Sequence, residues 1–192
     1  MKMKPTTWEE DKQLIQDLLS EGHTQECVNF MVYVDGKCRC RRAELPKLNL
    51  GCGFRKMEGF INVDIREECE PDHLVDLCQM PWPWGDNSMA MVRAVDFLEH
   101  LAHPHFVIEE IYRVLDADGL LYSMTPSTNG MGAFQDPFHY SFWNKNSWLY
   151  YMDDHHRGLY GIKAKFYGKV WEEVTDQNLG IVHVFTEIRA QK

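Results

Sequence analysis

A Gly-Cys-Gly turn and a carboxylate that follows it are the residues of this chain whose types and spacing could bind a nucleoside. An apolar run ends at Gly51, Cys52 and Gly53, and a second apolar run, from Phe60 to Val63, ends at Asp64. In an open parallel sheet ligands bind beyond the carboxyl ends of the strands, so the turn and the acid should face one pocket. Glycine lets the backbone approach a ligand closely, and an Asp in this position can accept hydrogen bonds from a ribose diol.

The spacing of these residues argues against a dinucleotide. A dinucleotide fingerprint requires a third glycine three residues after the second and an acid about 20 residues further on. Position 56 is Lys56, and Asp64 follows Gly53 by only 11 residues. The turn therefore lacks the tight helix start that binds a pyrophosphate, and a ligand with a ribose and an adenine but no phosphate fits better. The alternative is that Gly51 and Gly53 form a turn and nothing more.

Five short motifs occur in order along the chain. They are Asn-Leu-Gly-Cys-Gly at 49–53, Val-Asp-Ile at 63–65, Val-Asp-Leu at 75–77, Leu-Glu-His at 98–100 and Tyr-Arg-Val-Leu-Asp-Ala-Asp-Gly at 112–119. Together they resemble class I S-adenosylmethionine-dependent methyltransferases, in particular the small type 11 group. The resemblance extends over residues 46–127 and is looser towards the end of the chain.

This resemblance implies that S-adenosyl-L-methionine is the cofactor. It implies that Asp76 accepts a hydrogen bond from the adenine amine and that Leu77 packs near the ring. Asn49 stands where the family has an acid, and an amide can still donate and accept hydrogen bonds. The cofactor-binding residues that we expect are Asn49, Leu50, Gly51, Cys52, Gly53, Asp64, Ile65, Asp76, Leu77, Ala94, Val95 and Asp96.

The elements that must position these residues alternate between strands and helices. Apolar runs predict strands at 47–51, 60–64, 73–77, 89–95 and 120–125, then two more at 165–174 and 181–189. Helices are expected at 7–21, from Phe97 with a restart at Pro104, and at 146–154. The fold class that we expect is α/β, with a Rossmann-like open twisted sheet, mostly parallel with an antiparallel C-terminal strand pair, and helices on both faces. The crossover at 55–59 leaves space for little more than one helical turn, where parallel neighbours usually need a dozen or more residues.

Residues 1–45 are expected to form an extension, a helix and a hairpin, that precedes a methyltransferase-like domain at 46–192. The return strand of this hairpin, together with the residues that follow it, gathers basic side chains, namely Lys37, Arg39, Arg41, Arg42 and Lys47. A solvated edge strand is the favoured interpretation, and a contact for an anionic substrate is the alternative. A zinc site built from His23, Cys27, Cys38 and Cys40 is a further alternative, although the spacing lacks the paired Cys-x2-Cys knuckle.

Composition limits the partners and the location that we expect. The net charge of −9 disfavours nonspecific binding to phosphate backbones, so nucleic acid stays possible only through the basic hairpin. No apolar run approaches the roughly 18 residues that a membrane span needs. Six cysteines in a chain without an evident export signal are expected to be reduced thiols, which favours a cytoplasmic location.

Histidines and aromatic residues in the second half of the chain suggest an acceptor site. His100, His103 and His105 lack a carboxylate at ligand spacing, so we expect surface or capping histidines and no metal. Eight aromatic residues fall between Phe134 and Tyr151, which predicts either a second small core or a substrate lid with Asp136 and His139 at the chemistry. If the acceptor must lose a proton, His139 and His100 are the candidate bases, because an unperturbed imidazole titrates near pH ~6.5.

Methyl transfer from S-adenosyl-L-methionine to an unidentified acceptor is the function that these patterns favour. The acidic net charge favours a small molecule or a protein as the acceptor. One alternative is a protein that binds S-adenosylmethionine or S-adenosylhomocysteine without transferring the methyl group. Another is a zinc-stabilised interaction module built on residues 23–42.

Overall fold

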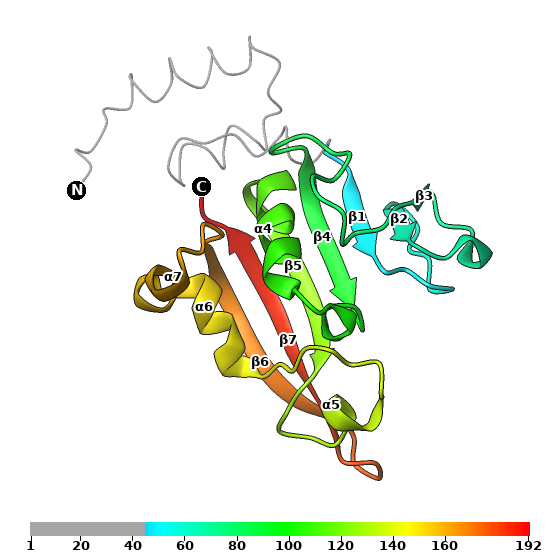
Figure 1. The fold of residues 1–192 in the computed structure, drawn as a ribbon, viewed down its shortest axis with the longest axis vertical. Helices are drawn as coiled ribbons and strands as arrows, with labels where there is room; N and C mark the ends of the chain where they lie inside the picture. Colours follow the sequence, from blue (N-terminus) through cyan, green and yellow to red (C-terminus); the bar gives the residue numbers. More distant parts are fainter. Residues whose placement is uncertain (1–44) are drawn as a thin grey trace, which may run out of the picture. The chain divides into compact units, whose positions relative to one another are not determined.

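A computed structural model describes residues 45–192, and residues 46–192 form one compact unit. The predicted helix at 7–21, the basic hairpin and the four candidate zinc ligands lie outside the described residues. Seven strands form one sheet in the order β3-β2-β1-β4-β5-β7-β6 (Figure 1). They are β1 (Lys47–Leu50), β2 (Ile61–Asp64), β3 (His73–Leu74), β4 (Met89–Val95), β5 (Leu115–Pro126), β6 (Phe166–Asp176) and β7 (Ile181–Ala190).

The pairing confirms the predicted sheet type. The strands β1 to β5 pair in parallel, whereas β7 runs antiparallel to both of its neighbours, β5 and β6. The fifth strand begins earlier than the predicted 120–125, because β5 starts at Leu115, which pairs with Met89. The next pair is Met91 with Leu120, so 116–119 lie in a bulge of a continuous strand. The third strand is also shorter than predicted.

The helices of the described part are short. They are η1 (Glu67–Cys69), η2 (Leu98–His100), α4 (Pro104–Val114), α5 (Gly132–Gln135), η3 (Lys145–Trp148), α6 (Leu149–Met152) and α7 (Asp154–Tyr160). Pro104 occupies the first turn of α4, where its missing N–H costs nothing. A capping box at Asn144 starts η3, and the Asp153 side chain caps α7. In this part of the chain, no helix is long and apolar enough to cross a membrane.

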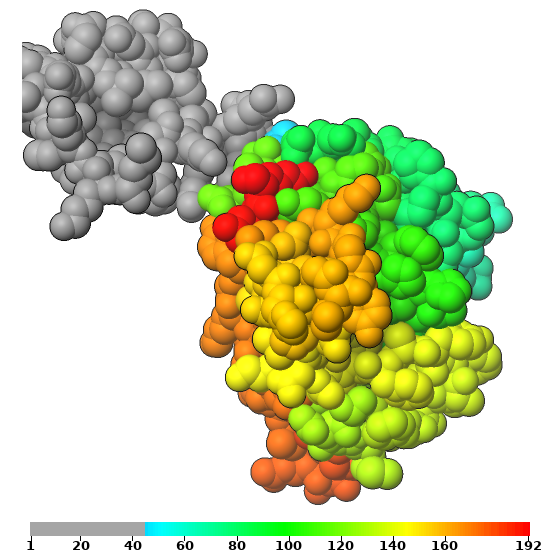
Figure 2. All heavy atoms as spheres, turned by 60° about the vertical axis from the view of Figure 1, so that its left-hand side comes forward, coloured from blue at the N-terminus to red at the C-terminus, as the bar shows by residue number. Residues whose placement is uncertain are grey.

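Alternating burial along the strands places the core on one face of the sheet. Val92, Leu121 and Ile188 are fully buried and pack with Ile108 and Ile111 of α4 in one hydrophobic cluster. The same cluster includes side chains from α6 and from the start of β6, and Figure 1 shows α4 across β4 and β5. In Figure 2 the residues near 150, drawn in yellow, lie in front of β6, drawn in orange. The Glu109 carboxylate joins α4 to the segment after α7 by accepting hydrogen bonds from the backbone N–H groups of 163 and 164.

Polar side chains replace the missing helix between β1 and β2. Asn49 donates to Asn62 Oδ1 (3.0 Å) and accepts from Arg93 Nη1 (2.7 Å). These three residues occupy one row across β2, β1 and β4. Asn62 also accepts from the Met57 N–H, and Asp72 accepts from the backbone and the side chain of Asn62. The short crossover is therefore fixed by buried and partly buried hydrogen bonds, and the buried one between Asn49 and Asn62 would be costly to leave unmade.

A glycine pair provides a test of the long β6–β7 hairpin. Gly168 has φ +140°, and a Cβ there would lie 2.4 Å from the Glu187 carbonyl oxygen of β7. Gly168→Ala should therefore lower the free energy of unfolding by roughly 2 kcal/mol or more, because both the backbone conformation and the strand spacing resist a side chain. Chemical denaturation of the full chain measures this loss.

Gly158→Ala is the matched control. Gly158 lies within α7, and nothing is within 4 Å of its hypothetical Cβ. Because alanine is a better helix former than glycine, this variant should gain about 0.5–1 kcal/mol. Equal stability losses in the two variants would contradict the described packing of β6 on β7.

Candidate cofactor and acceptor site

The turn after β1 depends on its two glycines. Gly51 has φ +58° and Gly53 has φ +50°, a left-handed conformation that L side chains rarely adopt. A Cβ on Gly51 would lie 2.5 Å from Cδ2 of Phe97, which packs directly against the turn. The N–H of Cys52, between them, donates to the Val63 carbonyl of β2 (3.0 Å). The turn is therefore a tight cradle whose inner side has no room for a side chain.

Asp64 closes this cradle from the end of β2. Its Oδ2 accepts a hydrogen bond from the Gly53 N–H (2.7 Å), and its Oδ1 accepts from the Arg66 N–H (3.0 Å). Burial alone would raise the pKa of Asp64, but these two N–H groups and the Arg66 guanidinium outweigh it and hold the pKa below its usual value. Asp64 is therefore a carboxylate that both shapes the turn and faces the cleft beside it.

A cleft of about 420 Å³ lies between the ends of β1, β2 and β4. Its lining includes predicted cofactor residues from four segments, namely Gly51, Asp64, Ile65, Asp76, Leu77 and Asp96. The lining also includes Arg66, Phe97 and His100. Asp76 is held by its own turn, because its Oδ1 accepts from the Cys78 N–H (2.9 Å). The cleft combines apolar walls with carboxylates, which suits a nucleoside.

A second pocket, of about 280 Å³, adjoins the glycine turn on the side of Val95. It contains Cys52 and Gly53 together with three arginines, Arg55, Arg66 and Arg93. Arg55 reaches across the pocket to Asp96, with 3.4 Å between Nη1 and Oδ2. Three guanidinium groups beside open backbone form an environment that favours a carboxylate.

A third pocket, of about 220 Å³, lies beyond the ends of β4 and β5. It brings together the three candidate catalytic residues, His100, Asp136 and His139, although His100 lies 36 positions before Asp136 in the chain. Asp96 lines this pocket as well as the other two. Asp96 has φ +49°, a strained conformation for a residue other than glycine and one that is found at functional sites. The three pockets therefore meet at one carboxylate.

Hydrogen bonds fix the orientation of both histidines. His100 Nδ1 lies 3.1 Å from the Phe138 carbonyl oxygen, and His139 Nδ1 lies 3.0 Å from the Ala133 carbonyl oxygen. A carbonyl only accepts, so each Nδ1 carries the proton and each Nε2 holds a lone pair in the neutral ring. His183 from β7 approaches the same pocket, with its Nε2 3.6 Å from Asp96 Oδ1.

Glu99 is a buried carboxyl group at this pocket. It is 2% exposed, and its Oε2 has no hydrogen-bond partner. Burial raises the pKa of Glu99 to about 8, and the negative charge of Asp96 contributes to the increase. Strongly shifted carboxyl groups in clefts are typical of functional sites.

Not all the predicted cofactor residues reach these pockets. Asn49, Leu50 and Ala94 line none of the three, because they are fully buried in the sheet beneath them. Asn49 supports the turn through the hydrogen bonds with Asn62 and Arg93. Sequence reasoning missed Arg55, Arg66, Arg93, Phe97, Glu99 and His183. Arg55 and Arg66 follow the predicted turn and acid closely in the chain, which is the signal that could have found them.

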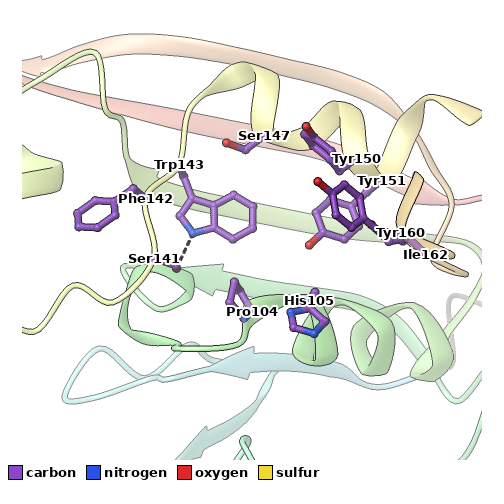
Figure 3. Close-up of a pocket in the computed structure, with 10 residues that line it drawn as sticks. All are labelled: Pro104, His105, Ser141, Phe142, Trp143, Ser147, Tyr150, Tyr151, Tyr160 and Ile162. Carbon is purple, nitrogen blue, oxygen red and sulfur yellow. Dashed lines mark hydrogen bonds between the residues drawn. The ribbon is translucent and has the colours of Figure 1, made fainter. Parts of the chain in front are cut away.

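A fourth cleft, of about 510 Å³, lies elsewhere (Figure 3). It runs between the start of α4, which provides Pro104 and His105, and a wall of aromatic side chains that includes Tyr150 and Tyr160. Trp143 forms part of this wall, and its Nε1 donates to Ser141 Oγ (2.9 Å). This cleft shares no lining residue with the three pockets at the strand ends, so the predicted cofactor residues do not take part in it.

Comparisons with known proteins agree with this geometry. Residues 60–123 match the family model described as a methyltransferase domain. A SAM-dependent methyltransferase from Archaeoglobus fulgidus has 14% identity and a TM-score of 0.55, with 94% of each chain covered. An S-adenosylmethionine-dependent methyltransferase from Mesorhizobium loti has 15% identity and a TM-score of 0.51, with 76% of this chain and 90% of the other covered. No curated protein matches the chain in sequence.

The same fold also occurs in a protein with a different activity. The [4+2]-cyclase SpnF has 14% identity and a TM-score of 0.53, with 97% of this chain and 84% of the other covered. At such identities the structural likeness shows the fold, whereas the reaction class rests on the family match within 60–123. Residues 60–123 therefore match a methyltransferase domain, and the described residues share the fold of S-adenosylmethionine-dependent methyltransferases of known structure.

Proposed function

We propose that the protein transfers the methyl group of S-adenosyl-L-methionine to a nucleophile that enters the pocket lined by Asp96, Glu99 and His139. The observation that supports this proposal is the position of Asp96, which lines all three pockets. His100 is likewise shared by the 420 Å³ cleft and the 220 Å³ pocket. A cofactor in the first two pockets and an acceptor in the third would therefore meet at the end of β4.

The residues of the first two pockets fit the parts of this cofactor. Asp64 would bind the ribose diol, and Asp76 would accept from the adenine amine beside Leu77. Arg55, Arg66 and Arg93 favour the carboxylate of the methionine part. Gly51 lines both pockets, and its backbone can contact a ligand closely because it carries no side chain.

The reaction requires little chemistry from the protein. The bound sulfonium supplies an electrophilic methyl group, so orientation and exclusion of water can provide most of the acceleration. His100 and His139 present unprotonated Nε2 atoms to the acceptor pocket and can accept a proton there. Asp136 lies 3.9 Å from His139 Nε2 and would stabilise the imidazolium that results.

The acceptor pocket favours a small group. Its volume of about 220 Å³ is below the range typical of drug-sized ligands, so a small molecule or a protein side chain fits better than a polymer backbone. The aromatic segment around it divides in two. Trp143, Trp148 and Tyr151 are buried in the core, whereas Phe134, Phe138 and Tyr140 are more than half exposed. We propose that the exposed aromatic residues contact the apolar part of the acceptor.

Nucleic acid is the less favoured acceptor. The net charge of −9 opposes a phosphate backbone, and the basic hairpin at 37–42 lies outside the described residues. A cytoplasmic location stays a prediction from the use of cysteine.

Replacement of Asp64 tests the cofactor cleft. Asp64→Ala removes the ribose acceptor and the bond that closes the glycine turn, so the affinity for S-adenosylhomocysteine should fall roughly 10- to 100-fold. Isothermal titration calorimetry of the full chain measures this change. Glu58→Ala, which removes an exposed acid from the neighbouring crossover, should bind as the native protein does. Unchanged binding in Asp64→Ala would contradict the proposed site.

Replacement of Phe138 tests the acceptor rim. Phe138 is 65% exposed, and its carbonyl oxygen lies 3.1 Å from Nδ1 of His100 in the acceptor pocket, so Phe138→Ala should raise the KM for an acceptor found by screening about tenfold. The Kd for S-adenosylmethionine should stay the same, since Phe138 does not line the cofactor cleft. Phe106→Ala removes a similarly exposed phenylalanine from α4 and serves as the control. A change in cofactor affinity with an unchanged acceptor KM would place the acceptor elsewhere.

A further inference from the structure

We propose that Glu99, His100 and His139 bind a divalent transition-metal ion in the acceptor pocket. One carboxylate oxygen and one ring nitrogen from each histidine lie within 4.8 Å of one another. An ion at about 2.1 Å from each ligand would hold these atoms about 3.4 Å apart, so small side-chain movements complete the site. From the sequence we predicted no metal, because the histidines at 100, 103 and 105 lack a carboxylate at ligand spacing. The third ligand comes instead from the segment after β5.

The hydrogen bonds of the two histidines are those of metal ligands. A metal-binding histidine usually donates its other ring N–H to a carbonyl or a carboxylate, which fixes the ring and its tautomer. His100 and His139 both use Nδ1 in this way, towards the carbonyls of Phe138 and Ala133. Both Nε2 atoms are therefore available, and the two rings are 5.0 Å apart between centroids.

Glu99 provides an independent indication of a ligand. It is 2% exposed, it lines the same pocket, and its Oε2 has no hydrogen-bond partner. A buried polar atom without a partner costs about 1–3 kcal/mol, and native proteins retain few of them without a reason. A bound cation would satisfy the carboxylate that the protein leaves unsatisfied.

The two segments that carry the ligands are joined before any ion binds. The N–H groups of Tyr140 and Ser141 both donate to the Glu99 carbonyl (2.8 and 3.0 Å). Ser141 Oγ donates to the Leu98 carbonyl (2.8 Å). His139 is thereby held opposite η2, which carries the other two ligands. This preorganisation lowers the entropic cost of binding an ion.

The ligand set indicates the class of ion. Two imidazoles with one carboxylate suit first-row transition metals such as Mn²⁺, Fe²⁺ or Zn²⁺, whereas Mg²⁺ and Ca²⁺ prefer oxygen ligands alone. Three protein ligands leave coordination positions open for water or a substrate. His100 also lines the cofactor cleft, so an ion in this place lies beside the methyl transfer position.

The consequence for the acceptor rests on the proposed function. An acceptor hydroxyl that binds the ion at an open position has a lowered pKa, so its O–H bond breaks and the proton passes to water. The resulting alkoxide oxygen stays at the ion and is the better nucleophile. The acceptor would then be an alcohol or phenol, and the two histidines would act as ligands rather than as bases.

Binding of Mn²⁺ to the cofactor-free full chain tests the site without any methyl transfer. After treatment with a chelator, the native protein should bind one Mn²⁺ per chain, seen as loss of the free-ion signal in electron paramagnetic resonance. Zn²⁺ should displace it. Glu99→Gln should weaken Mn²⁺ binding at least tenfold, because it replaces a carboxylate ligand by an amide of the same shape. His103→Ala removes an exposed histidine near the site and should leave binding unchanged.

Several results would overturn the proposal. No Mn²⁺ or Zn²⁺ binding by the native chain at 100 μM would do so, and so would equal binding by the native chain and Glu99→Gln. Thermal melting followed by circular dichroism checks that each variant folds. If Glu99→Gln does not fold, His139→Gln tests the metal site instead, because this substitution removes a different proposed ligand from the same pocket. Calorimetric titration with S-adenosylhomocysteine tests the cofactor site by itself. Normal cofactor binding without metal binding would therefore overturn the metal site alone.

Discussion

A row of hydrogen bonds that joins Asn49, Asn62, Asp72 and Arg93 supports the candidate site from below. Parallel neighbours are usually joined by a helix that packs on the sheet, and the ten residues 51–60 between β1 and β2 contain none. The side-chain amide of Asn62 forms hydrogen bonds with the crossover at Met57, with Asn49 of β1 and with Asp72 before β3. Arg93 extends the row to β4. This row joins the crossover to the strands whose ends carry the glycine turn, Asp64 and Asp96.

In the proposed arrangement, cofactor binding and methyl transfer meet at the end of β4. Asp96 leaves the strand in a left-handed conformation and reaches all three pockets, and Glu99 and His100 follow on one short helical turn. The opposing segment, 132–141, is remote in the chain and is held against this turn by hydrogen bonds from its last two backbone N–H groups to the Glu99 carbonyl. Such strain and burial are costly to stability, and they recur where a ligand offsets them.

Much of the fold follows from local patterns, while the site follows only in part. Glycine turns and short apolar runs located β1, β2, β4 and the last two strands to within a few residues. The early start of β5 was missed because Asp-Ala-Asp-Gly at 116–119 is not typical of a strand, and pairing with β4 overrides this local preference. Arg93 and His183 reach the pockets only through sheet register, which no single segment encodes. Asn49 was expected to bind the ligand, whereas its amide forms hydrogen bonds with Asn62 and Arg93 within the sheet.

A crystal structure of the full chain with S-adenosylhomocysteine tests most directly whether the cofactor and acceptor pockets meet at Asp96. We expect the ribose at Asp64, the adenine beside Asp76, and the sulfur atom at Asp96, facing His100 and His139. A sulfur atom at the mouth of the acceptor pocket would support the proposal that the two pockets meet at Asp96. A ligand in the aromatic cleft between α4 and α6, or a sulfur atom turned away from His139, would contradict the proposed arrangement.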